Sequence, residues 1–191
     1  MEEKTIFCYG DSNTNGFDPR SFLGGRYEAD SRWCDLLAEH TGHKVINAGE
    51  DGRMIPRGQW DFDELRWAMQ DSRPDLILVM LGTNDILCGA SYETAAERME
   101  ALLRFFHRGW ADIPLVLLGV PPVRIPDDTL CQEVERLNLR YARLAEQRGL
   151  VFCDVSGWGF SLACDGVHLS EEDHRRFAVR LEDFLREQDL L

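Results

Sequence analysis

Four short segments of this chain carry polar side chains at spacings that suit nucleophilic chemistry. Ser12 follows the apolar run 6–9. Asp165 and His168 share one loop, and Gly166 lies between them. That spacing lets the carboxylate fold back and accept the imidazole Nδ1–H, which leaves Nε2 free to take the proton of the Ser12 hydroxyl. The sequence therefore predicts a serine nucleophile, a histidine base and an aspartate that orients the base.

The same segments offer hydrogen-bond donors for the negative charge that develops on a carbonyl oxygen under attack. We expect these donors to be the backbone N–H groups of Ser12 and Gly49 and the side-chain amide of Asn84. Taken singly, Gly49 is an ordinary turn glycine, Asn84 an ordinary loop asparagine and His168 a surface residue ahead of a helix. The interpretation therefore depends on all four segments following the correct elements.

Five apolar runs are predicted strands, and segments of helical periodicity alternate with them. The predicted strands cover residues 5–9, 44–48, 76–81, 115–119 and 151–155. Repeated strand-then-helix order predicts an α/β fold in which one domain over residues 1–191 holds a parallel sheet with helices on both faces. The loops that follow parallel strands share one edge of the sheet, so the four polar segments are expected to meet there.

Apolar side chains recur at helical spacing in the segments between the strands. The predicted helices cover residues 32–40, 62–70, 92–106 and 130–144, and a last helix begins after Ser170. Ser170 and Asp173 resemble a capping box at the start of that helix. The charged surroundings of four other histidines predict that they are solvated; these are His40, His43, His107 and His174.

Net charge and cysteine usage indicate which binding partners and which cellular compartment to expect. The formal net charge of −13 argues against nucleic acid and anionic membrane surfaces, whose phosphates would repel the chain. No apolar run approaches the roughly 20 residues that a membrane span needs. The six cysteines show neither C-x-x-C pairing nor metal-ligand spacing with histidine, and the start Met1-Glu2-Glu3-Lys4 shows no secretory signal. We therefore expect a reducing cytoplasm and no metal site.

The sequence lacks the motifs of other protein classes that are built on strand-then-helix order. The chain has no G-x-G-x-x-G and no Walker-type loop, which argues against a nucleotide-binding protein. It also has no G-x-S-x-G elbow, which argues against an α/β-hydrolase. A nucleophilic pair of Cys164 with His168 is an alternative, but Ser12 is better placed after a buried strand.

Four blocks of the sequence resemble those of the SGNH hydrolases, also called the GDSL esterase family. The blocks are Gly10-Asp11-Ser12-Asn13, Asn47-Ala48-Gly49, Gly82-Thr83-Asn84-Asp85 and Asp165-Gly166-Val167-His168. The resemblance implies a three-layer α/β/α sandwich with a five-stranded, flavodoxin-like parallel sheet and no cofactor. It also implies a catalytic triad of Ser12, Asp165 and His168. The implied oxyanion hole consists of Ser12, Gly49 and Asn84.

The first block departs from the motif that names the family, because Asn13 replaces leucine. Together with Arg32-Trp33, the run 10–14 is similar to the arylesterase or acyltransferase-like branch. That branch acts on short acyl esters and can pass the acyl group to acceptors other than water. Asn15 replaces a bulkier aromatic residue often found there, so the shape of the pocket stays open.

These observations predict a cytoplasmic serine esterase that hydrolyses short-chain carboxylic esters through an acyl-enzyme on Ser12. Two alternatives stay open: an acyltransferase or carbohydrate O-acetylesterase with the same triad, and a non-catalytic ligand-binding module on the same fold. The expected partner is a small-molecule ester, and homo-oligomer formation stays open. The predicted substrate contacts are Asn13, Arg53, Met54, Ile86 and Val123.

Overall fold

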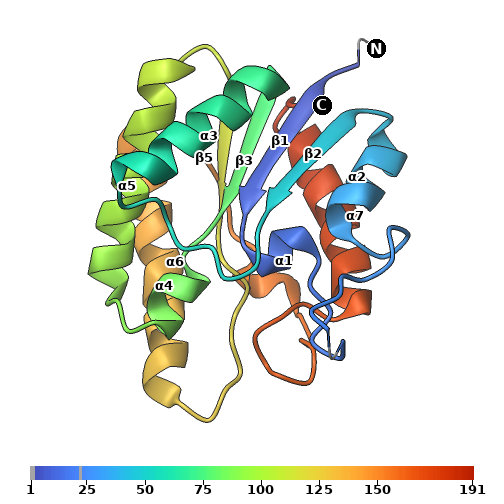
Figure 1. Cartoon of the computed structure of the whole chain (residues 1–191), viewed down its shortest axis with the longest axis vertical. Coiled ribbons are helices and arrows are strands. Elements are labelled where there is room, and N and C mark those ends of the chain that lie inside the picture. Colours follow the sequence, from blue (N-terminus) through green and yellow to red (C-terminus); the bar gives the residue numbers. More distant parts are fainter. Residues whose placement is uncertain (1–2, 22) are drawn as a thin grey trace.

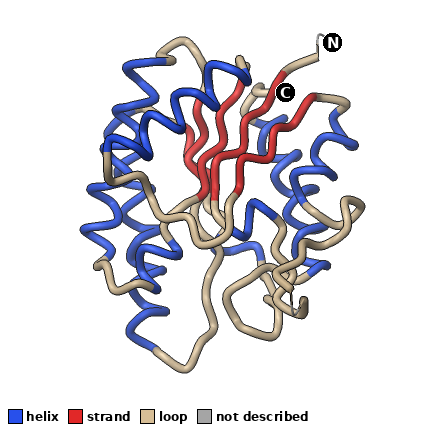
Figure 2. Tube along the Cα trace, in the orientation of Figure 1, coloured by secondary structure: helices blue, strands red, loops and turns tan. Residues whose placement is uncertain are grey.

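Five parallel strands form one sheet in the order β2-β1-β3-β4-β5 (Figures 1 and 2). The strands are β1 (Thr5–Gly10), β2 (Lys44–Gly49), β3 (Leu76–Met80), β4 (Leu115–Leu118) and β5 (Val151–Cys153). The coordinates are a computed structural model that describes residues 3–21 and 23–191. The predicted α/β class and the five parallel strands are confirmed, although β5 ends at Cys153 and the apolar run that predicted it reaches residue 155.

Helices cover both faces of the sheet, which confirms the three-layer sandwich (Figure 1). One face carries α2 (Trp33–Thr41) and α7 (Glu171–Glu187). The other carries α3 (Gln59–Ser72), α4 (Thr83–Leu87), α5 (Tyr92–Gly109) and α6 (Asp128–Arg148). The four-residue helix α1 (Ser12–Asn15) follows β1, and a short 3-10 turn covers Ser156–Trp158. No helix among the described residues is long and apolar enough to span a membrane.

A capping box fixes the start of α7, whereas the ends of other helices differ from those that periodicity predicts. Ser170 and Asp173 form the predicted capping box at the start of α7. α3 extends beyond the predicted segment 62–70 at both ends, to Gln59 and Ser72. Sequence periodicity misses α1 and α4 because four and five residues are too few to show a helical repeat.

Side chains of the central strands alternate between two cores, one on each face of the sheet. From β1, Phe7 and Tyr9 enter the core beneath α3–α6, whereas Ile6 and Cys8 enter the core beneath α2 and α7. Every residue of β3 is buried. Burial on both faces explains why these strands read as continuous apolar runs rather than as alternating patterns.

Two histidines predicted to be solvated are buried instead. His43 is 6% exposed and His174 is 0% exposed, whereas His40 and His107 are exposed as predicted. His174 shares the buried face of α7 with Asp173 and Phe177, whereas its charged neighbours Glu172 and Arg175 are exposed. Burial lowers the pKa of His174 to about 3, so its ring is neutral at pH 7.

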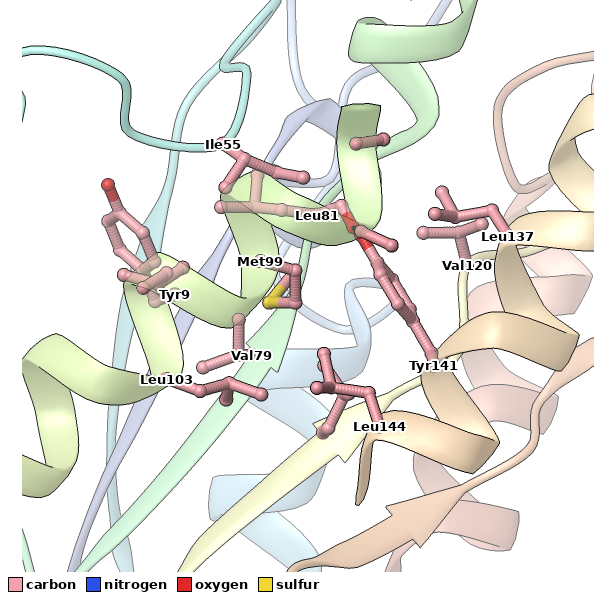
Figure 3. Packing of buried hydrophobic residues seen from close by; sticks show 14 of the residues in the cluster. Tyr9, Ile55, Val79, Leu81, Met99, Leu103, Val120, Leu137, Tyr141 and Leu144 are labelled. Atoms are coloured by element: carbon pink, nitrogen blue, oxygen red, sulfur yellow. Dashed lines mark hydrogen bonds between the residues drawn. The ribbon is translucent and has the colours of Figure 1, made fainter. Parts of the chain in front are cut away.

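Two polar side chains of α6 bind the backbone where β3 and β4 end. Asn138 is 6% exposed, accepts the Val120 N–H at 2.8 Å and donates to the Val120 carbonyl at 2.9 Å. The Tyr141 hydroxyl donates to the Leu81 carbonyl at 3.0 Å, and Figure 3 shows Tyr141 pointing toward Leu81. These bonds fix the points at which the loops of the site leave the sheet.

Asn138→Ala leaves the N–H and C=O of Val120 buried without a partner. We expect its free energy of unfolding to fall by about 2–4 kcal/mol, because each unsatisfied buried polar group costs about 1–3 kcal/mol. Urea unfolding measures the difference. The control is Leu139→Ala, since that neighbouring side chain is 64% exposed. Equal stability of the two variants would contradict the role given to Asn138.

Candidate active site

Ser12 begins helix α1 immediately beyond the end of β1. Asp11 caps this helix, because its Oδ1 accepts the Asn13 N–H at 2.9 Å. Ser12 is 7% exposed. Its backbone N–H donates to no acceptor in the part of the chain that the structure describes. Ser12 therefore presents both a hydroxyl group and an unused N–H at the carboxyl edge of the sheet.

His168 and Asp165 continue a chain of hydrogen bonds from the Ser12 hydroxyl. His168 Nε2 lies 2.9 Å from Ser12 Oγ, and His168 Nδ1 lies 2.5 Å from Asp165 Oδ2. The second oxygen of Asp165 accepts the N–H groups of Val167 and His168 at 3.0 and 3.1 Å. The structure thus brings together three predicted site residues that come from opposite ends of the sequence.

These hydrogen bonds favour the ionised form of Asp165. Burial alone would raise the pKa of this carboxyl group, but the hydrogen bonds from the His168 ring and from the N–H groups of Val167 and His168 outweigh burial and lower it. An ionised carboxylate accepts the Nδ1–H and so selects the tautomer whose Nε2 lone pair faces Ser12. The arrangement can therefore take a proton from the Ser12 hydroxyl.

Gly166 allows the loop to bring its acid and its base together. Its φ is +69°, in the left-handed region that favours glycine, and a Cβ atom there would collide with the Arg124 carbonyl oxygen. The Arg124 N–H donates to the Gly166 carbonyl at 2.7 Å. The loop that carries Asp165 and His168 is thereby tied to the segment that follows β4.

Asn13 fastens the same loop to α1. Its Oδ1 accepts the Leu169 N–H at 2.8 Å, and its Nδ2 donates to the Val167 carbonyl at 3.4 Å. The Trp33 indole N–H in turn donates to the Asn13 carbonyl at 2.9 Å. Asn13 is a predicted substrate contact, but it is 2% exposed and both ends of its amide are engaged by the loop. Its observed contacts hold the His168 loop in place.

Gly49 lies against α1 at the end of β2, in register with Gly10 of β1. A Cβ atom on Gly49 would overlap the backbone of Thr14 and Asn15, so only glycine permits this approach. The Gly49 N–H donates to Asn47 Oδ1 at 3.0 Å. The structure therefore places this predicted donor at the rim with its hydrogen directed to Asn47.

Asn84 lies in α4, just beyond β3. One hydrogen of its side-chain amide goes to the Arg53 carbonyl at 3.0 Å, which leaves the second for another acceptor. Its neighbour Asp85 is 1% exposed and binds the loop after β2, accepting the Ile55 N–H at 2.9 Å and pairing with Arg98 at 2.6 Å. α4 and the loop after β2 are therefore held together as one unit.

The remaining predicted substrate contacts differ in burial. Met54 is half-buried and lines a cavity of about 420 Å³, which Arg57 also lines. Ile86 and Val123 are 0% and 6% exposed and belong to the core beneath α3–α6, not to a surface that a substrate can reach. An apolar residue beside a loop reads the same in sequence whether it faces the core or the rim.

Two residues that contact the site received no role from the sequence. Asn47 donates to the Thr14 carbonyl at 2.9 Å, and Phe17 places its ring centroid 4.7 Å from that of His168. In the sequence, the position of Asn47 two residues before Gly49 indicates a role at the site. No sequence feature indicates a role for Phe17. The alternative base pairing with Cys164 is not observed, because the His168 ring nitrogens bind Ser12 and Asp165.

Residues 8–176 match the sequence profile of the GDSL-like Lipase/Acylhydrolase family, so the chain belongs to that family. No curated protein matches the chain at a significant level. Solved structures of similar fold cover nearly the whole chain.

Three solved structures illustrate which family members this chain is similar to. "A putative arylesterase" from Agrobacterium tumefaciens is 29% identical, with a TM-score of 0.83 over 98% of this chain and 100% of that one. The aryl esterase of M. smegmatis is 26% identical, with a TM-score of 0.80 over 98% and 100%. A carbohydrate acetylesterase family member from Sinorhizobium meliloti is 25% identical, with a TM-score of 0.82 over 96% and 98%. Membership of the family and these neighbours identify an ester-hydrolysing enzyme.

Folding shifts the pKa of Asp11, the residue immediately before Ser12. Burial raises its pKa from 3.8 to about 6, against the opposing effects of the Asn13 N–H, His168 and Arg53. The folded chain therefore binds more protons at Asp11 than the unfolded chain does between about pH 4 and 6. The stability that Asp11 contributes is fully present below pH 4 and is lost as the pH rises through 6.

Asp11→Asn keeps an N-cap acceptor but removes this titration. We expect the stability of the variant relative to wild type to increase by about 2 kcal/mol between pH 4 and pH 7, since one unit of pKa shift corresponds to about 1.4 kcal/mol. Urea unfolding at several pH values measures it. Asp127→Asn, which replaces the exposed N-cap of α6, is the matched control. A difference between wild type and Asp11→Asn that stays constant with pH would show that Asp11 has the same pKa in the folded and the unfolded chain.

Proposed function

We propose that this protein hydrolyses short-chain carboxylic esters through an acyl-enzyme on Ser12. The observation that carries the proposal is the chain of hydrogen bonds from Ser12 through His168 to Asp165, with lengths of 2.9 and 2.5 Å. Family membership and the similarity to arylesterase and carbohydrate acetylesterase structures support the same class of reaction.

In the proposed first half-reaction, His168 Nε2 takes the Ser12 proton while Oγ attacks the ester carbonyl carbon. The bond from that carbon to the alcohol oxygen then breaks, and His168 returns the proton to the leaving alcohol. In the second half, water gives a proton to His168 while its oxygen attacks the acyl carbon. The bond from that carbon to Ser12 Oγ then breaks, His168 returns the proton to Oγ, and the carboxylic acid leaves. Asp165 stays ionised in both halves and stabilises the imidazolium form of His168.

Two donors are ready to bind the oxygen anion that forms in each half-reaction. They are the unused N–H of Ser12 and the second side-chain N–H of Asn84. Gly49 joins them when its N–H is shared with, or released by, Asn47 Oδ1. Donors fixed before the reaction starts stabilise the anion without having to reorganise.

Deacetylation of carbohydrates is a second candidate, favoured by the similarity to the S. meliloti acetylesterase family member. Acyl transfer to another alcohol is a third, because it uses the same acyl-enzyme and differs only in the acceptor. Rates on p-nitrophenyl acetate, on longer acyl esters and on acetylated xylose, measured with and without an added alcohol acceptor, separate these reactions.

Ser12→Ala removes the proposed nucleophile and leaves the Asp11 cap of α1 intact. We expect kcat on p-nitrophenyl acetate to fall by about 10⁴-fold or more, as loss of such a nucleophile does elsewhere. Cys164→Ser is the control, because Cys164 is an exposed thiol that could itself react with an activated ester. Wild-type turnover by Ser12→Ala would reject the mechanism.

Asn84→Ala removes a donor from the anion site. We expect kcat to fall by roughly 10²–10³-fold with little change in KM, because the lost bond forms only in the transition state. Asn84→Asp keeps the size of the side chain but has no N–H, so it should lose as much. Steady-state kinetics on the same ester measure both. Near-normal kcat in the alanine variant would remove Asn84 from the anion site.

A further inference from the structure

Arg53 lies where the ends of β1 and β2 meet. It follows β2 in the loop that leads to α3. Both hydrogens of its Nη1 are engaged by backbone carbonyl oxygens, that of Gly10 at 3.0 Å and that of Ala48. Gly10 is the last residue of β1, and Ala48 immediately precedes Gly49, the last residue of β2. One guanidinium group therefore bridges the carboxyl ends of two strands.

The main chain of the same residue holds the third strand end. The Arg53 carbonyl accepts the side-chain N–H of Asn84 at 3.0 Å, and Asn84 belongs to the helix that follows β3. Ser12 lies two residues beyond Gly10, and Gly49 lies one residue beyond Ala48. Arg53 thus binds Asn84 itself and the backbone next to the two other predicted anion donors.

The remaining contacts lock the guanidinium in place. Its Nη2 pairs with Glu50 at 2.6 Å, its Cζ lies 4.6 Å from the centre of the Tyr9 ring, and the side chain is 19% exposed. Three of its five N–H donors are therefore used within the protein. The sequence predicts that Arg53 contacts substrate, but these bonds direct its charge into the rim of the sheet.

We propose that Arg53 is a positioning residue that sets the spacing of the anion donors Ser12, Gly49 and Asn84. The inference rests on the proposed function, because that spacing matters to the rate only if an oxygen anion forms. Arginine suits the position because its planar fork reaches two carbonyl oxygens while its face lies on an aromatic ring. Lysine offers a single point charge and cannot make both carbonyl bonds in the same geometry. Without the guanidinium, the ends of β1 and β2 lose its bridge and keep only the backbone pairing, such as the bond from the Glu50 N–H to the Gly10 carbonyl.

Two substitutions test this role, and Arg53→Lys is the milder of them. In Arg53→Lys and Arg53→Met we expect kcat to fall about 10–100-fold with KM within about threefold, because the loss is confined to the transition state. In Arg53→Lys the pH midpoint of kcat/KM should match that of wild type, since a positive charge stays near Asp11 and the contacts between His168 and Asp165 are untouched. Arg148→Met is the matched control, because Arg148 is a half-buried arginine paired with Glu100 far along α6 from the site. Wild-type kcat in both Arg53 variants would overturn the proposal.

A double-mutant cycle separates positioning from a general loss of stability. If Arg53 acts through the donors, Arg53→Lys combined with Asn84→Ala loses much less than the product of the two single losses. Losses that multiply would show that the two residues act independently and would contradict the proposal.

Amide hydrogen exchange tests whether Arg53 holds the strand ends, without any measurement of catalysis. The Glu50 N–H donates to the Gly10 carbonyl beside Arg53, at 3.2 Å, and the Lys44 N–H donates to the Lys4 carbonyl at the other end of the same strand pair, at 2.9 Å. We expect exchange at Glu50 to become at least about tenfold faster in Arg53→Lys while exchange at Lys44 is unchanged. Unchanged exchange at Glu50 overturns the positioning role. A wild-type protein that hydrolyses no ester, with Glu50 responding as expected, overturns the proposed function alone.

Discussion

The contact on which the site depends is the 2.9 Å hydrogen bond between Ser12 and His168, which joins the first strand end to the last loop of the chain. A parallel sheet makes this contact possible because the loops after all its strands leave from one edge. The sheet alone does not complete it, since the His168 loop is long. Asn13 closes the remaining gap by binding the backbone of that loop at Val167 and Leu169. The residue after the proposed nucleophile therefore places the proposed base.

The loops at this edge are held mainly by polar side chains that bind the backbone of a neighbouring loop. Asp85 holds Ile55, Asn138 holds Val120 and Arg53 holds Gly10. Buried N–H and C=O groups need partners, so each such bond is costly to break and fixes a loop at one distance. The same burial has an energetic cost at Asp11, whose pKa rises to about 6. Hydrogen bonds of buried polar groups, rather than apolar packing, therefore set the positions of the loops at the site.

Much of the fold and the residues that meet in the site could be predicted from the sequence, because both follow short-range patterns. Strands buried on two faces read as apolar runs, and the polar blocks come directly after them. What the sequence does not show is which way a side chain points. Ile86 faces the core and His174 lies on the inward face of α7, although their neighbours in sequence suggested otherwise. Arg53 reads as a pocket residue, and only the three-dimensional meeting of β1 and β2 reveals that its charge is used on backbone carbonyls.

The most direct test of whether His168 activates Ser12 is peptide mass spectrometry after incubation with a p-nitrophenyl phosphonate. We predict a single adduct, on the peptide that contains Ser12, formed at least about 10³-fold more slowly in a His168→Gln variant because the base is missing. Labelling of a different residue in wild type, or labelling of Ser12 at the same rate without the imidazole, would contradict the mechanism.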